Sequence, residues 1–112
     1  MSKPEKLAIT QWAEEDRPRE KLVEKGPLAL TNAELLAILL GSGNNEENAV
    51  DLAKRILQQY DHSLTKLLKT SINELKKFKG VGTAKAVTIM ASLELSRRIL
   101  AAKESTQNIR IT

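Results

Sequence analysis

Residues 75–86 of this 112-residue chain read LKKFKGVGTAKA, and this segment is the most informative part of the sequence for predicting the fold. Two glycines, Gly80 and Gly82, allow a tight turn and the close approach of another molecule to the backbone. Val81 between them is apolar and can anchor the turn in the protein. Ala86, one turn into the next helix, is small enough for two helices to cross closely. This spacing predicts a helix-hairpin-helix over residues 71–100.

The hairpin predicts an anion site, because its turn leads directly into a helix N-terminus. Backbone N–H groups there lack intrahelical acceptors, and the helix dipole is positive at that end. Phosphates are the same at every base step, so backbone donors would hold DNA without reading its sequence. We therefore predict sequence-non-specific DNA binding by the turn and its surrounding side chains, namely Lys76, Lys77, Lys79, Gly80, Val81, Gly82, Thr83 and Lys85.

A purely structural interpretation competes with this one, since two glycines also suit an ordinary helix–helix turn and lysines often form a solvated surface. Four clustered lysines favour DNA binding at the second hairpin. A degenerate copy, Gly41-Ser42-Gly43, is followed by Glu46 and Glu47, which would repel a phosphate. We expect that first hairpin to be structural. The two units share a pattern of helix, Gly-x-Gly and longer helix, which suggests an internal duplication packed about a pseudo-twofold axis.

Outward from the hairpin, apolar residues recur at three- and four-residue spacing, which predicts an all-α fold. We expect a compact bundle of five or six short helices, one clear helix-hairpin-helix and one degenerate copy. Capping boxes are predicted at Thr31–Glu34 and Ser71–Glu74, and an exposed pair at Asp51 and Arg55. The expected helices cover about residues 18–25, 33–40, 45 or 48 to 60, 63–68, 71–78 and 83–102. The expected divisions are an N-terminal extension (1–15), a helical domain (16–102) and a tail or the start of a truncated following domain (103–112).

Composition narrows the function classes. The net charge is +4, distributed as −2 over residues 1–60 and +6 over residues 61–112, so a polyanion would be drawn to the second half. With no cysteine and one histidine, the chain predicts no metal site and no cofactor. No nucleophile is paired with a base, so we expect no enzymatic activity. The lack of a long apolar run or signal peptide predicts a cytoplasmic protein that makes no membrane contact.

Several motifs together resemble the N-terminal region of the bacterial RadC-like proteins, over about residues 12–100. They are RPREKL at 17–22, LTNAELLAILLGSG at 30–43 and KGVGTAKA at 79–86. The resemblance implies a helical domain of the RuvA domain 2-like kind, followed in the family by a JAB/MPN domain with a metallopeptidase-like zinc site, and a link to DNA repair. The family's metal residues match nothing here. Two partners follow from it: DNA, or the JAB/MPN domain itself, for which this part would be an interaction or regulatory module.

Overall fold

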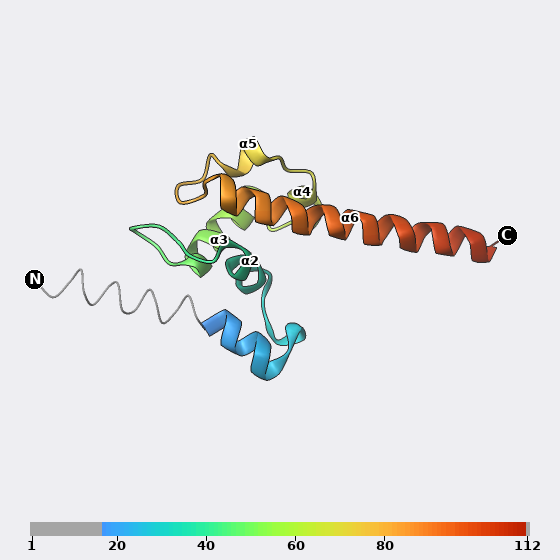
Figure 1. Cartoon of the computed structure of the whole chain (residues 1–112), viewed down its shortest axis with the longest axis horizontal. Helices are drawn as coiled ribbons and strands as arrows, with labels where there is room; N and C mark the ends of the chain where they lie inside the picture. The colour runs from blue at the N-terminus through green and yellow to red at the C-terminus, as the bar shows by residue number, and fades with distance from the viewer. Residues whose placement is uncertain (1–16, 112) are drawn as a thin grey trace, which may run out of the picture.

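A computed structural model describes the backbone of residues 17–111 and the side chains of residues 17–105, and every regular element in that part of the chain is helical (Figure 1). The predicted all-α class is confirmed. The predicted N-terminal extension lies outside the described residues. The elements are a helix over 17–25, a 3₁₀ turn η1 (Pro27–Ala29), α2 (Asn32–Leu40), α3 (Ala49–Gln59), α4 (Leu64–Leu68), α5 (Ile72–Leu75) and α6 (Thr83–Ile111).

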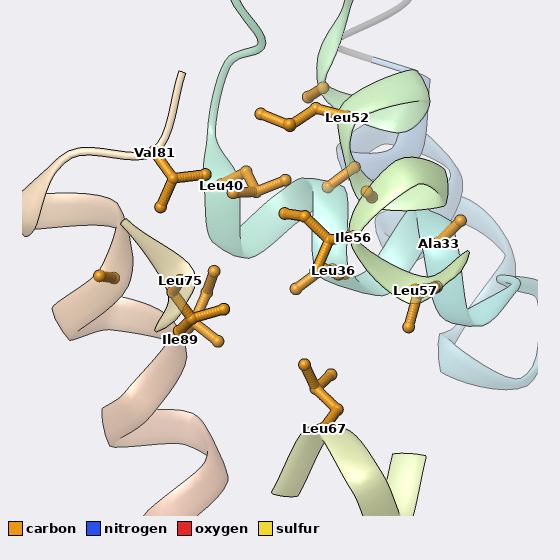
Figure 2. Close-up of a cluster of buried hydrophobic side chains, with 14 residues drawn as sticks. Ala33, Leu36, Leu40, Leu52, Ile56, Leu57, Leu67, Leu75, Val81 and Ile89 are labelled. Atoms are coloured by element: carbon orange, nitrogen blue, oxygen red, sulfur yellow. The ribbon is translucent and has the colours of Figure 1, made fainter. Parts of the chain in front are cut away.

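The core forms where α2 and α3 pack on each other and α2, α4 and α5 pack on α6. Leu52, Ile56, Leu75 and Ile89 are completely buried, and they come from α3, α5 and α6 (Figure 2). Burial of a leucine or isoleucine contributes about 1.5–3 kcal/mol, so this cluster holds the second hairpin against the first half of the domain.

Side-chain caps set most helix starts. Thr31 and Glu34 form the predicted capping box, in which each side chain accepts a hydrogen bond from the other's backbone N–H. The predicted box at Ser71 forms only in half: Ser71 Oγ accepts from Glu74 N at 3.2 Å, while the Glu74 carboxylate pairs with Lys77. The helix that it starts also ends at Leu75, so Phe78 lies in the turn and not in the helix as expected.

Helix α6 is longer than the sequence pattern predicted. It continues to Ile111 instead of ending near Ala102, and Figure 1 shows its second half projecting from the other helices. No glycine or proline interrupts residues 83–111, so the helix meets no local stop signal. Leu100, expected on the buried face, is half-exposed because the domain ends before it. The described helices include none with the length and apolar character needed to cross a membrane.

Candidate nucleic-acid interface

The second turn is built around one buried side chain. Val81 is buried, and its N–H donates to the carbonyl oxygen of Phe78 at 3.0 Å. Gly80 before it has a φ of 94°, a conformation that L side chains rarely adopt. Val81 therefore anchors the turn, and its own amide is used inside the protein.

The neighbouring amides are not used in this way. The N–H groups of Gly80, Gly82, Thr83 and Ala84 find no acceptor in the described part of the chain, and the last three residues are exposed. Ala86 N donates to Gly82 O at 3.0 Å, so Gly82 occupies the N-cap position of α6. The Thr83 hydroxyl likewise has no partner among the described residues. Backbone N–H donors without acceptors are therefore exposed at the N-terminus of the 29-residue helix α6, where the helix dipole favours negative charge.

Three of the four glycines at the two turns, Gly43, Gly80 and Gly82, differ in what requires them. A Cβ at Gly43 would lie 2.1 Å from the carbonyl oxygen of Glu47, and a Cβ at Gly80 would lie 3.0 Å from Asn44 Cβ. A Cβ at Gly82 would meet no atom within 4 Å, and the φ of Gly82 lies outside the left-handed region. Packing and backbone conformation therefore account for Gly43 and Gly80 but not for Gly82.

The two turns contact each other directly. Asn44 Nδ2 donates to Lys79 O at 3.1 Å, and Lys85 Nζ donates to the carbonyl oxygens of Ser42 and Gly43 at 2.8 and 3.2 Å. Residues 41–48, which we call the first loop, thereby hold residues 76–82, the second loop, in place. This contact joins segments more than 30 residues apart in the sequence.

Much of the predicted lysine charge already has a partner. Lys79 Nζ lies 2.5 Å from a carboxylate oxygen of Glu46, and Lys77 Nζ lies 3.5 Å from one of Glu74. Lys85 is bound to the first loop. Lys76 is exposed and forms no ion pair within the described residues. The sequence indicated four lysines around the turn, but it did not reveal that Glu46 from the other loop would pair with one of them.

Arg55 contacts both loops, a role that the sequence did not indicate. The expected pair with Asp51 is wrong: the Arg55 guanidinium lies 2.5 Å from Glu47, also donates to Lys79 O at 3.3 Å, and sits 5.8 Å from the centre of the Phe78 ring. The hydrogen bond from Arg55 lowers the pKa of Glu47. No local pattern links Arg55 to Phe78 and Lys79, since only the folded chain brings them together.

These features define an all-α domain in which two helix–loop–helix units pack through their loops and leave one helix start open to an anion. The sequence matches the family profile "UPF0758 N-terminal" over residues 9–87, and the chain belongs to this family, in agreement with its RadC-like resemblance. A UPF0758 protein of Porphyromonas gingivalis is 55% identical over 94 residues, which cover 83% of this chain and 41% of that relative. A UPF0758 protein of Coprothermobacter proteolyticus is 45% identical over 113 residues, which cover 100% of this chain and 47% of that relative.

The chain thus spans less than half the length of these relatives. A UPF0758 protein of Flavobacterium johnsoniae is 56% identical over 92 residues, and this match covers 40% of the length of that relative. No solved structure matches the sequence at a significant level. The names of these relatives state no activity, so the functional assignment rests on the chemistry of the site.

Proposed function

We propose that the second loop and the start of α6 bind the phosphate backbone of DNA without base specificity. In the longer relatives this part would hold DNA for the remainder of the protein, a role in line with the DNA repair that the RadC-like resemblance implies. The observation that carries the proposal is Gly82: it is exposed, it caps a long helix with an unused N–H, and neither packing nor φ requires a glycine there. Close approach of an external anion supplies a reason for glycine.

The surrounding charges permit this binding. The Lys79–Glu46 pair is exposed, with 59% and 74% of the two side chains accessible, and exposed pairs contribute only about 0–1 kcal/mol. A phosphate can replace Glu46 as the partner of Lys79 at little cost. Lys76 adds a cation that has no ion pair within the described residues. Binding of this non-specific kind is expected at a Kd of roughly 10⁻⁴–10⁻⁶ M, with a steep dependence on salt.

A pair of substitutions at Gly82 separates anion binding from folding. Serine and aspartate are both good N-caps and meet no neighbour at this position, so Gly82→Ser and Gly82→Asp should each change stability by only a few tenths of a kcal/mol. Only aspartate places a negative charge where the phosphate would bind. Fluorescence anisotropy with duplex DNA at low salt should show at least about 10-fold weaker binding for Gly82→Asp than for Gly82→Ser.

The two variants differ by a charged carboxylate in place of a neutral hydroxyl, and both are expected to be as stable as the unmodified chain, so a folding defect would not explain a difference between them. Equal affinities of the two variants for duplex DNA would show that the second loop does not contact the DNA. An NMR titration gives an independent readout, with amide shifts expected at Gly80–Ala86. Shifts spread over all lysines would indicate diffuse electrostatics, and no shifts at low salt would contradict DNA binding altogether.

A further inference from the structure

The RPREKL motif at residues 17–22 is the part of the family resemblance that the second loop does not explain. Two of its residues hold the helix over 17–25 on the rest of the domain (Figure 1). Pro18 is completely buried, and Lys21 Nζ lies 3.1 Å from a carboxylate oxygen of Glu34 in α2. Packing and ion pairing thus account for Pro18 and Lys21. They do not account for Arg19, which is exposed.

Arg19 reaches the first loop without bonding to it. A Cβ at Gly41, where this loop begins, would lie 3.8 Å from Arg19 Nη2 and would meet no other atom within 4 Å outside its chain neighbours. Gly41 is also the C-cap of α2, where an arginine can donate to the last carbonyl oxygens of the helix. Arg19 makes no such bond, and it has no hydrogen bond or ion pair in the described part of the chain. The N–H donors of its guanidinium therefore remain available to an external acceptor.

Ser42 adds two donors next to Gly41. The residue is exposed, and its carbonyl oxygen accepts a hydrogen bond from Lys85 Nζ at 2.8 Å. Its N–H and its hydroxyl find no partner among the described residues. The start of the first loop thus presents a guanidinium, a backbone amide and a hydroxyl, which are three of the groups that commonly bind phosphate oxygens.

The two carboxylates of the first loop, which argued against anion binding there, have other partners. Glu47 pairs with Arg55, and Glu46 pairs with Lys79. Arg55 also donates to the carbonyl oxygen of Lys79, so both pairs lie around this lysine. The repulsion that the sequence predicted is therefore centred on Lys79 and not on residues 41–42.

We propose that Arg19 and Ser42 form a second phosphate contact for the DNA that the second loop binds. This contact rests on the proposed function, because it belongs to the same DNA, and it brings the helix over 17–25 into the interface. The bond from Lys85 to Ser42 keeps the two sites close: through standard bond lengths, Arg19 Nη2 is at most about 15 Å from Lys85 Nζ. Phosphates repeat at about 3.4 Å of rise along each strand, so one short stretch of duplex can meet both sites.

Two arginine substitutions test this contact at the same net charge. Arg17 is the matched control: it is exposed on the same helix, about 160° from Arg19, and lines a separate pocket with Glu34 and Asp51. Arg19→Gln should weaken binding to duplex DNA at least about 5-fold at low salt and flatten the slope of log K against log salt by about one unit. Arg17→Gln should stay within about 2-fold of the unmodified chain. Anisotropy at several salt concentrations gives both values, and circular dichroism checks that both variants stay helical.

A second pair of variants places a charge in the first loop itself. Ser42→Asp and Ser42→Asn differ by a carboxylate in place of an amide of the same shape, and Ser42 is exposed, so both variants should be equally stable. Ser42→Asp should bind duplex DNA at least about 10-fold more weakly than Ser42→Asn. In an NMR titration with DNA, the amide of Ser42 should shift together with those of Gly80–Ala86.

Equal affinities of the two arginine variants, or of the two Ser42 variants, would overturn the second contact. The Gly82 variants report separately on the second loop. If they differ while the arginine variants agree, the proposed function stands and only its extension to Arg19 fails. The reverse result would support the contact at Arg19 and reject the second loop as a DNA contact. No binding at low salt would reject both.

Discussion

Glycine is present on both sides of Val81 for different physical reasons. Gly80 is required by the protein itself, because its φ of 94° is unfavourable for other residues and Asn44 packs against its Cα. Gly82 has ordinary backbone geometry and open space around it. The two glycines look equivalent in the sequence but have different roles. Gly80 allows the backbone conformation of the turn, and Gly82 leaves the space beside the helix start open.

Alanine substitution should separate these roles. Gly80→Ala is expected to lower the free energy of unfolding by about 1–3 kcal/mol, because alanine at this φ is strained and its Cβ pushes on Asn44. Gly82→Ala should lower it by no more than about 1 kcal/mol, because alanine is a poorer N-cap than glycine while a less flexible unfolded chain offsets part of that loss. Urea unfolding monitored by circular dichroism measures both, and a similar loss in the two variants would contradict the assignment.

At the scale of elements, α3 and its preceding loop hold the second loop in position. Arg55 of α3 joins Glu47 of the first loop, the Lys79 carbonyl and the Phe78 ring. Glu47 also accepts a hydrogen bond from Asn44, whose amide reaches Lys79 O as well. One carboxylate thus supports both residues that hold the second loop.

This arrangement predicts a specific acid sensitivity. The pKa of Glu47 is lowered, chiefly by the hydrogen bond from Arg55, so its contribution to stability is present above the unfolded-state pKa and is lost as pH falls through the folded-state pKa. Glu47→Gln should destabilise the domain at pH 7 by about 1–2 kcal/mol, and its deficit should shrink towards about pH 3. Thermal unfolding at both pH values tests this, and a deficit independent of pH would exclude the charged pair as its cause.

At the scale of the whole molecule, folding pairs charges from the acidic and the basic half of the chain. Glu46 belongs to the acidic half and pairs with Lys79 of the basic half, so folding brings a carboxylate beside the predicted DNA contact. The sequence alone placed these charges 33 residues apart. The local charge of the site is therefore lower than the lysine count indicates.

Glu46→Gln should strengthen DNA binding while leaving stability nearly unchanged. The exposed pair contributes little to folding, whereas its removal frees Lys79 and eliminates a charge that repels phosphate. Affinity should rise a few-fold, and the slope of log K against log salt should steepen by up to about one unit. Anisotropy titrations at several salt concentrations provide both values. An unchanged affinity and slope would exclude Lys79 from the contact.

Local signals in the sequence sufficed for the all-α class, for most helix starts and for the second loop, because caps, glycines and helical periodicity act within a few residues. The full length of α6 was missed because the apolar pattern fades after Lys103, although nothing there breaks a helix. Tertiary structure alone decided which charges pair around the turn and which glycine the protein itself needs. Those outcomes depend on Asn44, Glu46 and Arg55, which lie far from the turn in sequence and reach it only when the core has packed.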